Sequence, residues 1–141
     1  MTEMTELNGN DHVRRLVTGP TVSLRREQQL DEAAAVLATN EIGAAVVKSG
    51  NQSIGVISER DVVKAFAADG DDFSNLRVAD VMSTQVETIE GSASILEASR
   101  RMVQGGIRHL AISDGDGPLG LISMRDLLAV LAGESDAASI G

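Results

Sequence analysis

Apolar residues follow two different spacings along the chain, and each spacing predicts a different kind of element. One helical face is formed by Leu30, Ala33, Ala34 and Leu37. The short runs Ala44–Val47 and Ile54–Ile57 are apolar and contain β-branched residues, which predicts two buried strands. A short strand over Thr21–Leu24 and a helix over Glu59–Ala68 complete this part of the chain.

The same pattern occurs a second time. Gly55–Asp61 aligns with Gly120–Asp126, 65 positions later, and the apolar positions of the two halves stay in step without a gap. The second copy ends in a helix predicted over Met124–Ala132. We therefore predict an α+β fold, a mixture of helices and strands built from two tandem β-α-β-β-α repeats.

The limits of this pattern divide the chain into four parts. Residues 13–70 form the first repeat and residues 71–132 the second. Residues 1–12 and 133–141 carry no periodic apolar pattern, so a flexible N-terminus and a flexible C-terminal tail are predicted. A single repeat of about 60 residues is marginal as an independent fold. The two repeats are therefore expected to share a core.

Composition and charge remove several classes of function. The 141 residues carry a formal net charge of −9, and Phe66 and Phe73 are the only aromatic residues, which argues against nucleic acid as a partner. Cysteine is absent, so thiolate metal sites and cysteine nucleophiles are excluded. The acidic start, residues 1–6, does not match a secretory signal. The longest apolar stretches fall far short of a bilayer's thickness, and a cytoplasmic protein without a membrane partner is expected.

Catalytic and metal-binding motifs are not recognisable, and we predict a protein that is not an enzyme. The two histidines, His12 and His109, are not accompanied by a serine in a nucleophile elbow. Asp114–Gly117 has the spacing that opens a calcium loop, but the twelfth position is Arg125 instead of a bidentate glutamate. This segment is interpreted as a turn, and no metal site or required cofactor is predicted.

Two short motifs open the last helix of each repeat. They are Ser58-Glu-Arg-Asp61 and Ser123-Met-Arg-Asp126. In the structural interpretation, serine caps the helix and aspartate completes a capping box. In the functional interpretation, the free N–H groups of the helix start bind phosphate, while the aspartate accepts hydrogen bonds from ribose hydroxyls. Local sequence alone leaves both open.

Four basic side chains have two interpretations as well: ordinary surface charge, which local sequence favours for an isolated Arg–His pair, or contact with a phosphate. Arg108 and His109 precede a predicted strand in the second repeat only, because Gly43 and Ala44 occupy the matching positions of the first. Arg60 and Arg125 lie within the two motifs.

Taken together, the repeated Gly-apolar-Ile-Ser-x-Arg-Asp stretch, Val78–Ser83 and Ile107–Ile112 resemble the tandem CBS domain, or Bateman module, over residues 13–132. The resemblance implies a pseudo-twofold pair of repeats and a homodimer. It also implies that an adenine nucleotide (AMP, ADP or ATP) or a related adenosyl ligand binds in the cleft between the repeats. The ligand-binding residues it implies are Ser58, Arg60, Asp61, Arg108, His109, Ser123, Arg125 and Asp126. Such modules regulate an effector protein, here unknown; the alternative is a dimerisation module without a small ligand.

Overall fold

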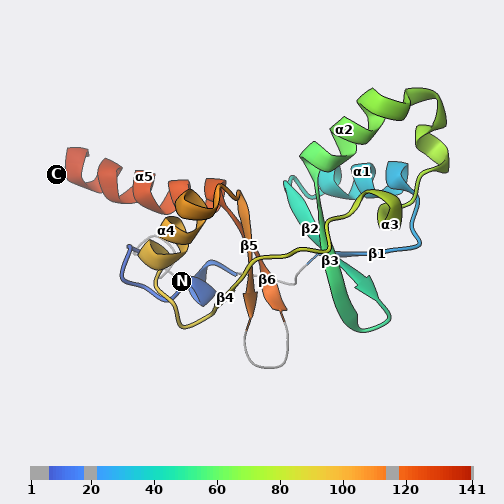
Figure 1. The fold of residues 1–141 in the computed structure, drawn as a ribbon. Coiled ribbons are helices and arrows are strands. Elements are labelled where there is room, and N and C mark those ends of the chain that lie inside the picture. Colours follow the sequence, from blue (N-terminus) through green and yellow to red (C-terminus); the bar gives the residue numbers. More distant parts are fainter. Residues whose placement is uncertain (1–6, 18–21, 114–117, 141) are drawn as a thin grey trace. The chain divides into compact units, whose positions relative to one another are not determined.

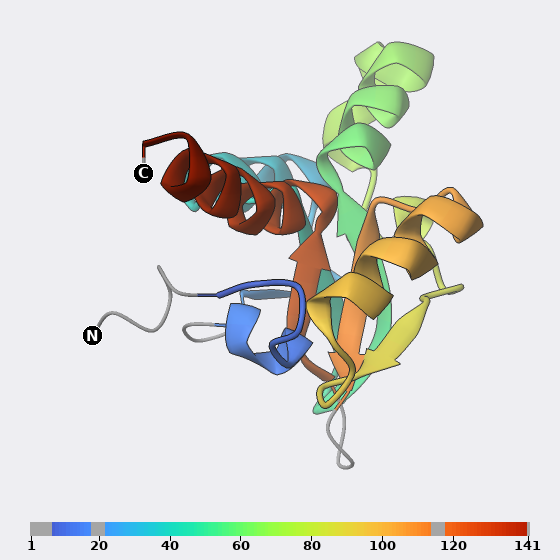
Figure 2. The ribbon, with the colours of Figure 1, turned by 90° about the vertical axis from the view of Figure 1, so that its left-hand side faces the viewer.

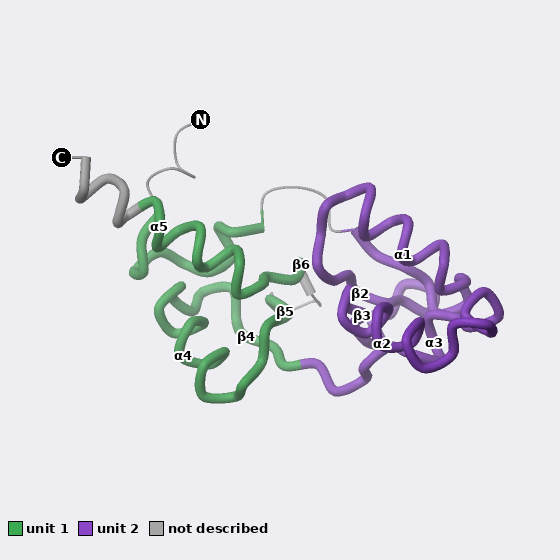
Figure 3. The backbone as a smooth tube through the Cα atoms, turned by 90° about the horizontal axis from the view of Figure 1, so that it is seen from above, with its two compact units in different colours: residues 1–20, 87–141 green, residues 21–86 purple. Residues whose placement is uncertain are grey.

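The computed structural model describes residues 7–17, 22–113 and 118–140, which fall into two compact units (Figure 3). Unit 1 comprises residues 1–20 and 87–141, and unit 2 comprises residues 21–86. Each unit contains a three-stranded sheet and helices, so the predicted α+β class is confirmed. The turn predicted at residues 114–117 lies outside the described residues.

Unit 2 contains the predicted β-α-β-β-α order (Figure 1). Its elements are β1 (Ser23–Arg25), α1 (Leu30–Thr39), β2 (Ala44–Ser49), β3 (Gln52–Ser58), α2 (Glu59–Asp69), the 3-10 helix η3 (Gly70–Asn75) and α3 (Val78–Val81). The sheet order is β1-β2-β3, with β1 parallel and β3 antiparallel to β2. Leu30, Ala33 and Leu37 of α1 are buried, which confirms the predicted helical face.

Unit 1 repeats this arrangement. Its elements are the 3-10 helix η2 (Val13–Leu16), β4 (Thr88–Glu90), α4 (Ile95–Gly105), β5 (His109–Ser113), β6 (Pro118–Ser123) and α5 (Met124–Ile140). The sheet order is β4-β5-β6, and α4 and α5 cover the same face of that sheet (Figures 1 and 2). α5 continues to Ile140, beyond Ala132, where the apolar pattern ends and a flexible tail is expected.

The compact units do not follow the limits of the sequence repeats, because the short segment at the start of each repeat packs in the unit that contains most of the other repeat. Val13, at the start of the first repeat, is fully buried in unit 1, where its N–H donates to the Ala93 carbonyl at 2.7 Å. Val78, 65 positions later, is fully buried in unit 2, where its N–H donates to the Gln28 carbonyl at 2.9 Å. The repeats thus exchange their entry segments.

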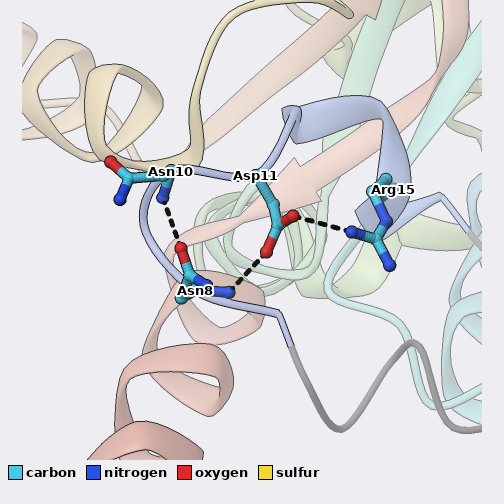
Figure 4. Close-up of polar contacts among 4 residues, drawn as sticks. All are labelled: Asn8, Asn10, Asp11 and Arg15. Carbon is cyan, nitrogen blue, oxygen red and sulfur yellow. Dashed lines mark hydrogen bonds and ion pairs between the residues drawn. The ribbon is translucent and has the colours of Figure 1, made fainter.

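Residues 7–12 also have defined positions in unit 1, in contrast to the flexible N-terminus predicted over residues 1–12. Leu7 is only 4% exposed and belongs to the apolar core. The Gly9 and Asp11 carbonyls each accept an N–H from the first turn of α4 at 2.9 Å. Asp11 also accepts from the Asn8 N–H at 2.8 Å and from the Arg15 guanidinium at 2.7 Å (Figure 4). One isolated leucine gives no periodic signal, so the sequence pattern did not reveal this anchor.

In unit 2, the chain that follows α3 passes beside β3. Val56 and Ser83 exchange two backbone hydrogen bonds, each 2.9 Å long. A Cβ atom on the neighbouring Gly55 would lie 2.5 Å from the Ser83 carbonyl oxygen. The first glycine of the repeated motif is therefore required by the close approach of another backbone segment.

Among the helices of the described ranges, none is both long and apolar enough to cross a membrane.

Candidate functional site

The two serine–aspartate motifs form the same capping box at the starts of α2 and α5. In unit 2, the Asp61 N–H donates to Ser58 Oγ at 3.1 Å, and the Ser58 N–H donates to Asp61 Oδ2 at 2.9 Å. In unit 1, the Asp126 N–H donates to Ser123 Oγ at 3.1 Å, and the Ser123 N–H donates to Asp126 Oδ2 at 2.7 Å. The structural interpretation of these motifs is therefore confirmed.

Capping leaves both motifs with hydrogen-bonding capacity. A serine oxygen that accepts one N–H still carries its own donor hydrogen, and a carboxylate has about four acceptor positions. Asp61 is half-buried, and Asp126 is exposed. The N–H groups of a helix's first turn lack partners within the helix and carry a partial positive charge. The remaining capacity of the serine and aspartate side chains, together with the partial positive charge of the helix start, suits hydroxyl and phosphate ligands.

The antiparallel pairing in each sheet brings a second segment to each helix start. In unit 1, His109 of β5 pairs with Ser123 of β6, and the Met124 N–H donates to the Arg108 carbonyl at 2.9 Å. Arg108 and His109 therefore lie at the same end of unit 1 as the Ser123–Asp126 motif. We call this group of residues, Arg108, His109 and Ser123–Asp126, the Ser123 end.

Unit 2 has the equivalent geometry with different side chains. Ala44 of β2 pairs with Ser58 of β3, and the Glu59 N–H donates to the Gly43 carbonyl at 2.8 Å. We call Gly43, Ala44 and Ser58–Asp61 the Ser58 end. The predicted site residues are thus collected in two groups, one in each unit.

The arginine side chains of these groups face solvent. Arg60, Arg108 and Arg125 are exposed, while His109 is half-buried. Exposed guanidinium groups are available to an anion that approaches from solution, and arginine pairs well with phosphate.

Two contributors to these ends were not singled out from the sequence. The carbonyls of Gly43 and Arg108 hold the first residues of α2 and α5, and Gly55 lets the 82–84 segment approach the motif-bearing strand. The two carbonyls could not be found from the sequence, because any residue has a backbone carbonyl. The repeated glycine at 55 and 120 was a visible signal for the second contributor.

Within residues 7–17, 22–113 and 118–140, no three His, Asp or Glu side chains gather closely enough to hold a metal ion.

Comparison with known families gives two matches in tandem. The CBS domain model matches residues 13–68 and 78–133. The chain belongs to the CBS-domain family. The resemblance to the tandem CBS domain is confirmed.

Relatives and solved structures agree with this assignment. An uncharacterized protein from Methanopyrus kandleri is 37% identical over 86 residues, which are 60% of this chain and 44% of that protein. The CBS domain-containing protein YhcV from Bacillus subtilis is 29% identical over 82% of this chain and 81% of its own length. The CBS domain protein PAE2072 from Pyrobaculum aerophilum, solved in complex with AMP, is 27% identical, with a TM-score of 0.74 over 86% of this chain and 95% of that one.

The match covers 44% of the length of the Methanopyrus kandleri protein and also 44% of the length of an uncharacterized protein from Methanocaldococcus jannaschii, which is 27% identical over 126 residues.

Proposed function

We propose that this CBS pair is a regulatory module that binds an adenine nucleotide or a related adenosyl ligand and signals its presence to an effector protein. The binding residues are those of the Ser58 end and the Ser123 end. The module performs no chemistry of its own, and its output is a change in the interaction with the effector.

The observation that carries this proposal is the doubled helix start. Each unit presents a serine hydroxyl, an aspartate and the start of a helix at the end of a β-hairpin, with exposed arginine beside them. Hydroxyl, carboxylate and N–H groups together match the hydroxyls of ribose and the oxygens of phosphate. The Pyrobaculum relative binds AMP, which supports an adenosine-containing ligand.

A second candidate is a dimerisation module without a small ligand. It is favoured by the capping boxes themselves, since capping alone gives Ser58, Asp61, Ser123 and Asp126 a structural task. This candidate predicts that the four residues affect stability and nothing else.

Calorimetric titration separates the two candidates. AMP, ADP, ATP and S-adenosylmethionine are titrated into the protein, and thermal unfolding is followed with each compound. A ligand present at 100 times its dissociation constant adds about 2.7 kcal/mol to the free energy of unfolding. Absence of both heat and stabilisation with all four compounds refutes the binding proposal in favour of the ligand-free module.

Variants then test the residues. Asp61→Asn and Asp126→Asn are expected to weaken binding by about 1.5–3 kcal/mol, the range for hydrogen bonds to a charged group. Asp80→Asn is the control, because Asp80 Oδ2 likewise accepts the N–H of the residue three positions earlier, Arg77, at 2.9 Å, at a helix start outside both ends. If all three variants lose stability equally and none loses affinity, the aspartates only cap.

We also propose that the chain forms a homodimer through its exposed apolar helix faces. Val63 and Phe66 of α2 are 65% and 59% exposed, and the residues 65 positions later, Leu128 and Leu131 of α5, are 63% and 44% exposed. Both repeats thus expose apolar residues at equivalent helix positions, and exposed apolar patches mark interaction surfaces. Light scattering of Leu128→Glu should show a monomer, while Ala35→Glu on exposed α1 surface should leave the wild-type mass unchanged.

A further inference from the structure

The Ser58 end and the Ser123 end have the same backbone geometry but opposite local charge. The Ser58 end carries two carboxylates, Glu59 and Asp61, and one guanidinium, Arg60. The Ser123 end carries one carboxylate, Asp126, and two guanidinium groups, Arg108 and Arg125. One end therefore has an excess of one negative charge and the other an excess of one positive charge, with His109 counted as neutral.

The equivalence of the two backbones makes this comparison meaningful. Glu59 and Met124 are both the first residue of a helix, and each donates its N–H to a carbonyl of the segment before the central strand, at 2.8 and 2.9 Å. The acceptor residue is Gly43 in one unit and Arg108 in the other. The difference between the ends therefore lies in the side chains that this shared framework displays.

We propose that the Ser123 end selects phosphorylated adenosyl ligands, whereas the Ser58 end selects adenosyl ligands without phosphate. Given the binding function proposed above, on which this inference rests, Arg108 and Met124 determine specificity at one end, and Gly43 and Glu59 determine it at the other. Glu59 occupies the position in α2 that Met124 occupies in α5. A phosphate that approaches the Ser58 end therefore meets a carboxylate, whereas at the Ser123 end it meets a thioether.

The size of the effect follows from exposure and charge. Hydrogen bonds between arginine and phosphate are charge-assisted and about twice as strong as neutral ones. A phosphorylated ligand can form such bonds at the Ser123 end, whereas the ribose of a ligand without phosphate cannot. In a chain of net charge −9, a polyphosphate also needs local positive charge to approach. Because these side chains are exposed, the preference should weaken as salt rises and the Debye length shortens.

Calorimetry of ATP and adenosine on matched variants tests the inference. Arg108→Ala and Met124→Glu should each lower ATP affinity about tenfold while changing adenosine affinity less than about twofold. Glu59→Met, the reciprocal change, should increase ATP binding at the Ser58 end. Arg100→Ala is the control, because it removes the same charge from an exposed position of α4 outside both ends.

Two results overturn the inference while leaving the binding function intact. In the first, Arg108→Ala weakens ATP and adenosine by the same factor. In the second, it weakens ATP no more than Arg100→Ala does. A wild-type protein that binds neither ATP nor adenosine, nor the other adenosyl compounds titrated above, overturns the proposed function itself. An ATP affinity that does not change between low and high salt contradicts the electrostatic origin of the preference.

Discussion

Substitution of Gly55 by alanine should destabilise unit 2, and the structure gives the reason. The new Cβ would lie 2.5 Å from the Ser83 carbonyl oxygen and 3.3 Å from Met82 Sδ. The methionine side chain can move, but the carbonyl belongs to the backbone. Relief therefore requires the 82–84 segment to move away from β3, which breaks the two 2.9 Å hydrogen bonds between Val56 and Ser83.

The expected loss is about 1–2 kcal/mol. Two backbone hydrogen bonds contribute about 1 kcal/mol each. The lower chain entropy of alanine in the unfolded state returns about 0.4–1 kcal/mol, since Gly55 does not have a positive φ that would strain an alanine. Urea unfolding should show a midpoint about 1 M or less below that of the wild type, with the m-value unchanged.

Gly70→Ala is the matched control for this substitution. Gly70 has a helical backbone (φ −51°, ψ −42°), and a Cβ there meets nothing within 4 Å. This variant should be neutral or slightly more stable than the wild type. Met82→Ala combined with Gly55→Ala should not restore stability, because the 2.5 Å contact is with the backbone. If Gly55→Ala and Gly70→Ala unfold within about 0.5 kcal/mol of each other, the close-approach argument is refuted.

Two further perturbations test the exchanged segments. Val13→Ala and Val78→Ala each remove methyl groups from a fully buried side chain and should lower the free energy of unfolding by about 1–3 kcal/mol. Amide hydrogen exchange should accelerate in unit 1 for Val13→Ala and in unit 2 for Val78→Ala. The opposite result would contradict the assignment of each entry segment to its unit. Deletion of residues 1–12 removes Leu7 from the unit 1 core and should raise amide exchange at Ile95 and Leu96, which lose the Asp11 and Gly9 carbonyls; unchanged exchange there would show that the segment is dispensable.

The elements of each repeat could be predicted from the sequence because their periodicity and their burial have the same cause. Leu30, Ala33 and Leu37 are spaced for one helical face, and that face is buried. The capping boxes were equally visible, since a serine and an aspartate three positions apart need only a helix start between them. Local rules sufficed for these features.

The partner of each entry segment could not be predicted, because the repeat makes the two choices equivalent. Val13 and Val78 occupy the same position of two similar sequences, so either one satisfies the pocket of either unit by pattern alone. The grouping of Arg108 with Ser123–Asp126 needed the hairpin register, in which His109 lies opposite Ser123. The pairing of β5 with β6 depends on the turn between them, and the sequence of that turn does not determine which residues lie opposite each other.

The exchange also explains why the two repeats occur as one chain. The first N–H of α1, at Leu30, donates to the Leu76 carbonyl, and the first N–H of α4, at Ile95, donates to the Asp11 carbonyl, both at 2.9 Å. The first N–H of each helix is therefore bound by a residue outside the helix's own repeat: Leu76 belongs to the second repeat, and Asp11 belongs to the segment before the first repeat. A fragment cut between the repeats would keep its sheet but lose the buried valine and the carbonyl that complete its unit, leaving backbone donors and apolar surface exposed. The smallest piece of this chain that satisfies one sheet and its helices is thus not one repeat but a repeat together with the start of the other, so that each unit, with the motif that opens its last helix, is built from both repeats.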